Sequence, residues 1–289
     1  MSSNPVPIER RLQLAAGLRL QCRVAGDAAL PALVLLHPSP RSSAMFEPWM
    51  RVLAPHFRVV AVDTPGYGGS DPLPVPPSGL QDYLGPLREL LLAVAGPRFF
   101  LYGSATGAQL AIAYALRHAA DVQHLLLDNA AHFDDSERQP MLLRYFPDLT
   151  PQADGAHLLR AWAMCAQMAE FFPWYENNEA HRVAPGPPSA AEVQGALREL
   201  LAAGPAYAQA YRAAFEHEDA AHVQALKLPT TLLRWSGSIL LKHIDRLLQF
   251  PLPACVQMLN TPAPLAERYQ AMTAHLLTLK AGLHERSSA

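Results

Sequence analysis

Short segments of high β propensity alternate along this chain with longer segments of helical spacing. Ala32–Leu36 is wholly apolar, and Phe99–Tyr102 and Leu125–Asn129 repeat the pattern. Strands that are apolar on both faces are typical of parallel sheets covered by helices on either side. The order therefore predicts an α/β fold with a mostly parallel sheet flanked by helices. Arg11–Leu14 and Leu18–Val24 predict an antiparallel hairpin at one edge of that sheet.

The strand signal disappears between about residues 134 and 222. Three segments of helical spacing occupy this interval: Asp154–Glu170, Ala190–Ala203 and Pro205–His217. Strand patterns resume at Thr230–Trp235. A block of helices inside an otherwise regular alternation is typical of a lid. We predict a core domain of residues 1–133 and 223–289, interrupted by a helical cap of residues 134–222.

The composition limits the partners of the chain. Half of the 289 residues are hydrophobic, 17% are charged, and the formal net charge is −2. This balance gives a sizeable core and no basic surface for nucleic acid or an anionic membrane. Three scattered cysteines, Cys22, Cys165 and Cys255, predict buried thiols, and Met1–Arg11 contains no apolar stretch typical of a signal peptide. We expect a cytoplasmic protein with a small-molecule substrate, and the sequence leaves a homo-oligomer open.

The segment Gly103–Gly107, with the sequence G-S-A-T-G, lies between a predicted strand and a predicted helix. It resembles the nucleophile elbow of the α/β-hydrolase superfamily, G-x-nucleophile-x-G, whose glycines permit a tight turn between closely packed backbones. Residues 63–71, D-T-P-G-Y-G-G-S-D, resemble a second segment of that superfamily. With the further apolar strand Arg58–Asp63 counted, Leu125–Asn129 is the sixth predicted strand, and the predicted cap follows it, as it does in the superfamily. The resemblance implies the α/β-hydrolase fold with an inserted helical cap.

A narrower resemblance concerns the loop after the strand Ala32–Leu36. His37–Ser43, with the sequence H-P-S-P-R-S-S, and the cap segments that contain Trp162 and Trp174 are similar to a bacterial capped subgroup. In that subgroup the centre of the elbow is often not serine, and the final catalytic histidine is missing. The resemblance supplies no substrate.

The elbow centre here is Ala105, and a methyl group cannot attack a carbonyl carbon. The superfamily places its catalytic histidine just after the last strand, but Leu259–Glu267 contains none. The acid expected after Thr230–Trp235 is also absent from Ser236–Leu241. Three missing groups favour a natural loss of the triad. A serine-type hydrolase inactivated by a single substitution at Ala105 remains an alternative.

Other residues near the elbow are candidates for non-covalent chemistry. Arg41 and the Thr106 N–H could polarise a carbonyl oxygen, and His157 or His37 could transfer protons. Asp128 stands where some members of the superfamily place their acid. The competing interpretations are a loop cation for Arg41, hydrogen-bonded structural histidines, and a loop-capping aspartate. Predicted substrate-binding residues are the following: Ser39, Ser104, Ala105, Thr106, Trp162 and Trp174.

These residues predict an enzyme that acts on a small apolar carbonyl or ester-like compound without a covalent intermediate. A lyase, a decarboxylase or a general-base hydrolase would suit them. The alternative from another class is a catalytically silent binding protein that keeps the pocket. We expect no cofactor and no metal, because the sequence contains neither metal-ligand spacing nor a G-x-G-x-x-G segment after a strand.

Overall fold

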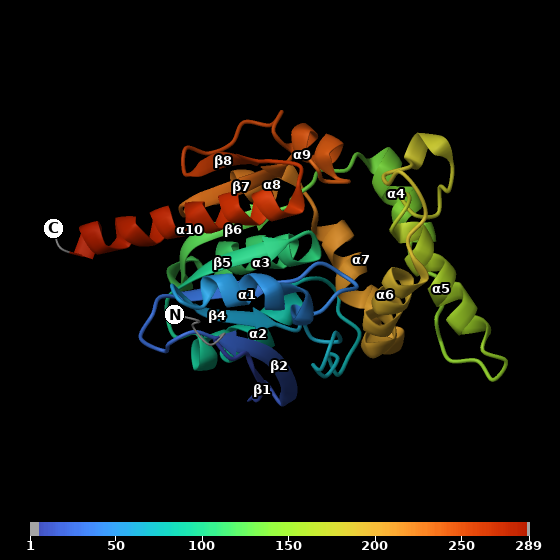
Figure 1. The fold of residues 1–289 in the computed structure, drawn as a ribbon, viewed down its shortest axis with the longest axis horizontal. Helices are drawn as coiled ribbons and strands as arrows, with labels where there is room; N and C mark the ends of the chain where they lie inside the picture. The colour runs from blue at the N-terminus through green and yellow to red at the C-terminus, as the bar shows by residue number, and fades with distance from the viewer. Residues whose placement is uncertain (1–5, 288–289) are drawn as a thin grey trace, which may run out of the picture.

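The computed structural model describes residues 6–287, with side chains as far as residue 282. The outermost residues of the predicted core domain, 1–5 and 288–289, lie outside this range. At the centre of the molecule is an eight-stranded sheet in the order β1-β2-β4-β3-β5-β6-β7-β8 (Figure 1). The strands are β1 (Glu9–Ala15), β2 (Leu18–Ala25), β3 (Ala32–Leu36), β4 (Arg58–Val62), β5 (Phe99–Ser104), β6 (Val122–Asp128), β7 (Thr230–Trp235) and β8 (Val256–Thr261).

The strand directions confirm the predicted fold class. β1 and β2 form the predicted hairpin, and β2 pairs antiparallel with β4. Every pair from β4 through β3, β5, β6 and β7 to β8 is parallel. Along β3 the side chains alternate between two core clusters, with Val34 and Leu36 on one face and Leu33 and Leu35 on the other. This period of two explains why a wholly apolar strand is needed at the centre.

Helices cover both faces of the sheet. Buried side chains of α2 (Gln81–Val94), α3 (Thr106–Arg117) and the short α8 (Ala220–Gln224) join the cluster on one face. Those of α1 (Glu47–Leu53) and α10 (Leu265–Ser287) join the cluster on the other. Figure 1 shows α10 continuing past the ends of the strands toward the C-terminus.

The inserted helices lie past the ends of the strands, on the side opposite the projecting end of α10 (Figure 1). The predicted helical segments are found as α5 (Ala156–Met168), α6 (Ala190–Ala203) and α7 (Ala208–His217). The helices α4 (Asp135–Arg144) and α9 (Leu241–Leu247) were not predicted from the sequence. No helix in the described part of the chain is long and apolar enough to cross a membrane.

The two elbow glycines set how closely β5, α3 and β3 approach one another. A Cβ on Gly103 would lie 2.1 Å from the carbonyl oxygen of Gly107. A Cβ on Gly107 would lie 2.3 Å from the carbonyl oxygen of Leu36, at the end of β3. Because both obstacles are backbone atoms, neither can move aside without shifting a strand or a helix. The glycines therefore serve close packing, as their place in the motif predicted.

We expect Gly107→Ala to destabilise the protein by about 1–3 kcal/mol, because the added methyl group overpacks the contact with β3. Gly195→Ala is the matched control, since Gly195 lies inside α6 and a Cβ added there would have nothing within 4 Å. This control should stabilise by about 0.5–1 kcal/mol through helix propensity. Urea unfolding of both variants measures the difference, and equal midpoints would contradict the packing argument.

Candidate functional site

The chain turns sharply at Ala105 between β5 and α3. Ala105 has φ 48° and ψ −110°, a positive φ that is uncommon for a residue other than glycine. Its N–H donates to the carbonyl oxygen of Asp128 at 2.9 Å, and its own carbonyl oxygen accepts from the N–H of Ala108 at 2.9 Å. These bonds hold the strained turn in place. The structure thus keeps the backbone geometry of an elbow while a methyl group stands at its tip.

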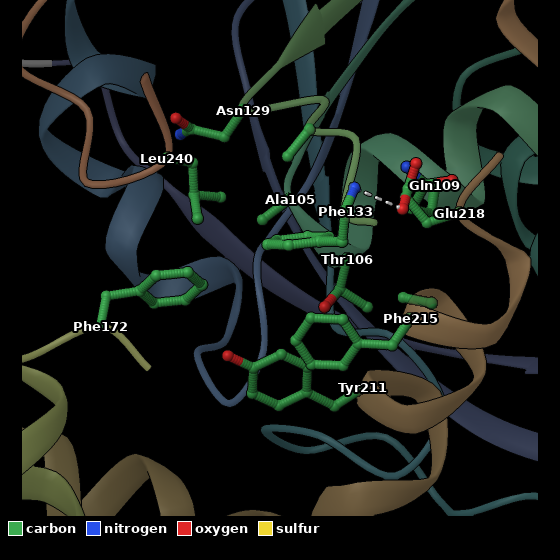
Figure 2. Close-up of a pocket in the computed structure, with 12 residues that line it drawn as sticks. Ala105, Thr106, Gln109, Asn129, Phe133, Phe172, Tyr211, Phe215, Glu218 and Leu240 are labelled. Atoms are coloured by element: carbon green, nitrogen blue, oxygen red, sulfur yellow. Dashed lines mark hydrogen bonds between the residues drawn. The ribbon is translucent and has the colours of Figure 1, made fainter. Parts of the chain in front are cut away.

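A cavity of about 60 Å³ lies beside this tip (Figure 2). Space of this size holds a few water molecules or a compound of a few non-hydrogen atoms. Phe172 reaches it from the cap, and Tyr211 and Phe215 reach it from α7 (Figure 2). The wall is therefore mostly aromatic and apolar. The lining residues are Ala105, Thr106, Gln109, Asn129, Ala131, Phe133, Phe172, Tyr211, Ala214, Phe215, Glu218 and Leu240.

Thr106 supplies the polar groups nearest the tip of the elbow. Its hydroxyl is buried and has no hydrogen-bond partner among the described residues. Thr106 is also the first residue of α3, where backbone N–H groups have no acceptor within the helix and the helix dipole favours negative charge. A ligand oxygen beside Ala105 would meet the hydroxyl and the positive end of a 12-residue helix.

The other polar groups of the cavity already have protein partners. The side-chain amide oxygen of Gln109 accepts from Nδ1 of His217 at 3.0 Å. The side-chain amide oxygen of Asn129 accepts from the Ser238 hydroxyl at 2.6 Å. Burial, followed by the charge of a neighbouring histidine, lowers the pKa of His217 to about 4. His217 is therefore a neutral donor at pH 7.

Glu218 and Tyr211 are the two titratable side chains of the cavity wall. One Glu218 oxygen lies 2.8 Å from Nδ1 of His132, and the other accepts from the Phe133 N–H at 3.0 Å (dashed in Figure 2) and from Arg138 at 2.8 Å. These bonds occupy both carboxylate oxygens. Tyr211 donates to the Tyr145 hydroxyl, and burial raises its pKa well above 10. Both side chains are therefore already hydrogen-bonded to other groups of the protein.

The loop after β3 does not supply the predicted chemistry. Nε2 of the buried His37 accepts from the Thr64 N–H at 3.1 Å, so its Nδ1 carries the hydrogen and bonds the Pro38 carbonyl at 3.0 Å. Burial also lowers the pKa of His37. This ring is a fixed neutral support, which corrects its assignment as a proton carrier. Ser39 is buried in the same loop but does not line the cavity.

Arg41 forms an ion pair with the inserted helices. Its guanidinium Nε lies 2.7 Å from Glu199 of α6, and its N–H donates to the Pro38 carbonyl oxygen at 3.0 Å. The side chain therefore links the loop to the cap and does not line the cavity. Arg41 was predicted to polarise a carbonyl at the elbow; its Nε pairs instead with Glu199 of the inserted helices.

The predicted cap residues also lie elsewhere. Nδ1 of His157, in the first turn of α5, accepts from the Gln152 N–H at 3.0 Å. Trp162 is exposed on α5, and the Trp174 indole donates to the Tyr145 carbonyl oxygen at 3.1 Å. None of the three lines the cavity, so their predicted site roles are corrected. Phe172, two residues before Trp174, is the cap aromatic that reaches it.

Asp128 and Ser104 end β6 and β5 and do not line the cavity. The Asp128 carboxylate is buried, accepts from the Tyr102 hydroxyl at 2.6 Å and pairs with Arg268 of α10. The Ser104 hydroxyl accepts from the Asn129 side chain at 3.4 Å. Asp128 is thus the structural partner of Arg268, in place of the predicted acid, and Ser104 does not contact the cavity.

Of the predicted site residues, the structure brings Ala105 and Thr106 together in the cavity wall. The sequence analysis missed Gln109, Asn129, Phe133, Tyr211, Phe215 and Glu218. Three of these carried a usable signal: Asn129 directly follows β6, and Tyr211 and Phe215 are spaced by four on one helix. Nothing in the pattern identified Arg268 as the partner of Asp128.

Comparison with known proteins agrees with the architecture. A family model described as alpha/beta hydrolase fold matches residues 31–163. A solved hydrolase from Pseudomonas aeruginosa PA01 aligns with 96% of this chain and 99% of its own, with a TM-score of 0.68 and 19% identity. The chain is an α/β-hydrolase-fold protein.

Curated relatives match a shorter part of this α/β-hydrolase-fold chain. Epoxide hydrolase 3 of Xenopus tropicalis is 34% identical over 122 residues, which are 40% of this chain and 32% of that protein. The pimeloyl-[acyl-carrier protein] methyl ester esterase of Nitrosospira multiformis is 38% identical over 98 residues, 34% of this chain and 37% of that protein. The chain thus spans about a third of the length of these two relatives.

The Asp128–Arg268 pair gives a test of the site's structure. Arg268→Met should destabilise this α/β-hydrolase-fold protein by about 3–5 kcal/mol, because it leaves a buried carboxylate without a counter-ion. Adding Asp128→Asn should restore most of the loss, since an amide keeps the acceptor for Tyr102 without the charge.

Arg234→Met is the matched control. Its pair with Asp245 is partly exposed, with 28% and 41% of the two side chains accessible, so the loss should be about 1 kcal/mol or less. Urea unfolding compares the variants. Equal small losses for the two arginine variants would contradict the role given to Arg268.

Proposed function

We propose that this chain binds a small, uncharged, mainly apolar carbonyl compound in the cavity beside Ala105, without forming a covalent intermediate. One observation carries the proposal: the tip of an intact elbow points a methyl group into an aromatic cavity whose titratable side chains are already engaged. A site of this kind suits binding by shape and one oxygen contact.

The carbonyl oxygen is the group that the elbow suits best. The buried Thr106 hydroxyl has no protein partner among the described residues, and leaving a buried donor unmatched costs about 1–3 kcal/mol. A carbonyl oxygen would accept from this hydroxyl and from the first N–H groups of α3. A carboxylate is less well suited, because Glu218 lies in the same wall and the aromatic rings offer no counter-ion.

Catalysis without a covalent intermediate was the first hypothesis from the sequence, and the geometry favours it less. A lyase or general-base hydrolase needs a proton acceptor within reach of the substrate. Arg41 and His157 lie outside the cavity wall, and His37 has both ring nitrogens bonded to the backbone. Binding without chemistry is therefore the function we place first.

We also propose that the protein works in a reducing compartment, as a cytoplasmic protein does. Cys22, Cys165 and Cys255 are free thiols. Burial raises the pKa of Cys22 and of Cys165 to about 11, so these thiols are unreactive and serve as small core residues.

Ala105→Ser tests whether the chain is a hydrolase disabled at one position. Losing a triad costs roughly a millionfold in turnover, so restoring a complete one would return several orders of magnitude. We expect the variant to hydrolyse 4-nitrophenyl acetate less than about tenfold faster than the parent, since no free imidazole lines the cavity in the described part of the chain to take the hydroxyl proton. Initial rates measure this directly.

Ala131→Ser is the matched control, because it adds a hydroxyl to the same cavity wall away from the elbow. The two serine variants should be equally slow. A burst of nitrophenol from Ala105→Ser alone, with mass spectrometry locating an acetyl group on the introduced serine, would contradict the proposal.

Thr106→Val tests the carbonyl contact itself. Valine has nearly the shape of threonine without the hydroxyl, so binding of 2-pentanone should weaken by about three- to tenfold, the worth of one hydrogen bond. Titration followed by NMR of the Ala105 and Ala131 methyl groups measures the affinity. Thr278→Val, on the exposed side of α10, should leave it unchanged. An unchanged affinity in Thr106→Val would contradict the assigned contact.

A further inference from the structure

His243 lies directly behind the aromatic wall of the cavity. It belongs to α9, and only 8% of its surface is exposed. The centre of its ring is 4.5 Å from that of Phe133 and 5.8 Å from that of Phe172, and both phenylalanines line the cavity. Both phenylalanines therefore pack against His243 and also line the cavity.

The ring of His243 is oriented by a carboxylate. Its Nε2 lies 3.4 Å from Glu137, which also pairs with Arg246 and accepts from the Asp134 N–H at 3.2 Å. Since a carboxylate accepts, Nε2 carries the hydrogen, and the opposite nitrogen, Nδ1, presents a bare lone pair. Burial lowers the pKa of His243, with Glu137 opposing this effect and Arg246 and Lys242 adding to it. The ring is therefore neutral at pH 7.

Nδ1 of His243 is buried and has no hydrogen-bond partner within the described part of the chain. Leaving a buried acceptor without a donor is costly, so buried polar atoms of native proteins nearly always have a partner. The other contacts of this residue are complete: its N–H donates to the Leu240 carbonyl oxygen at 2.9 Å, and its carbonyl oxygen accepts from the His132 N–H at 3.0 Å. Only the lone pair of Nδ1 is unassigned among these groups.

We propose that Nδ1 of His243 is a second polar anchor of the cavity, which accepts a hydrogen bond from a hydroxyl or N–H of a ligand reaching between Phe133 and Phe172. This inference rests on the proposed function, because the carbonyl end of the same ligand lies at Thr106. The ligand class becomes narrower as a result. It is a neutral compound with an oxygen acceptor at one end and a hydrogen-bond donor at the other, such as a hydroxy ketone.

A pair of matched probes tests this anchor. 4-Hydroxy-2-butanone and 2-pentanone have the same number of non-hydrogen atoms, and a hydroxyl in the first replaces a methyl in the second. We expect the hydroxy ketone to bind about three- to tenfold more tightly to the parent protein at pH 7.5, as one hydrogen bond to a buried acceptor predicts. Its binding should also shift the ¹⁵N resonance of the His243 Nδ1, while 2-pentanone leaves that resonance in place.

Two variants separate the anchor from a general effect on folding. His243→Phe removes the acceptor but keeps a ring against Phe133, and Glu137 retains Arg246 as its partner. The preference for the hydroxy ketone should vanish while the affinity for 2-pentanone stays the same. His243→Asn keeps an acceptor near the position of Nδ1 and should retain part of the preference.

The outcomes distinguish the anchor from the proposed function. If both ketones bind the parent equally, with the Ala105 methyl signal moving in each titration, carbonyl binding stands and the His243 anchor is overturned. If neither ketone moves the Ala105 signal, the proposed function fails and the anchor fails with it. A preference for the hydroxy ketone that remains in His243→Phe also overturns the anchor. In the parent protein, an unchanged ¹⁵N resonance of His243 Nδ1 on binding of the hydroxy ketone overturns it as well.

Discussion

The close packing of β5, α3 and the end of β3 around Ala105 is the constraint on which the rest of the site depends. Gly103 and Gly107 let three backbones approach to distances that no side chain would permit. The residue between them is forced to a positive φ, and its side chain is directed into the cavity. The geometry that presents a nucleophile is therefore set by packing alone, and it persists when the side chain is a methyl group.

The charged side chains near this elbow are held in ion pairs with other residues of the protein. Asp128 is paired with Arg268 on the far side of the sheet, and Glu218 has Arg138 and His132 as partners at the cavity wall. A buried ion pair stabilises little, but losing one partner is costly, so such pairs fix their members in place. Carboxylates held in this way fix the positions of neighbouring elements. The Thr106 hydroxyl at the elbow and Nδ1 of His243 behind Phe133 are two uncharged groups without a hydrogen-bond partner among the described residues.

The fold was largely predictable from sequence, because the spacing of apolar residues reflects which faces of a strand or helix are buried. The apolar run Ala32–Leu36 is central because both faces of β3 are covered, and the inserted helices follow from the loss of strand pattern. The helix α4 escaped prediction, although Asp134 and Glu137 form a capping box at its start. Most residues of α4 are polar, so its apolar pattern was weak.

The site was harder to predict, because side-chain direction and pairing are tertiary properties. Ala105 and Thr106 were identified because the elbow turn fixes their directions locally. Arg41 and Asp128 are residues of a suitable type in the expected segments. However, Arg41 forms an ion pair with Glu199, and Asp128 forms one with Arg268, and both partners are far away in the sequence. A local sequence pattern cannot identify partners that are so distant in the chain.

The most direct test of the account follows the carbonyl carbon of a bound ketone. The ¹³C spectrum of carbonyl-labelled 2-pentanone, recorded with saturating protein, reports whether that carbon stays trigonal. We predict one saturable resonance in the carbonyl region, moved downfield by hydrogen bonding at Thr106. A resonance of a tetrahedral carbon would reveal a covalent adduct and contradict the account, as would a spectrum that the protein does not change.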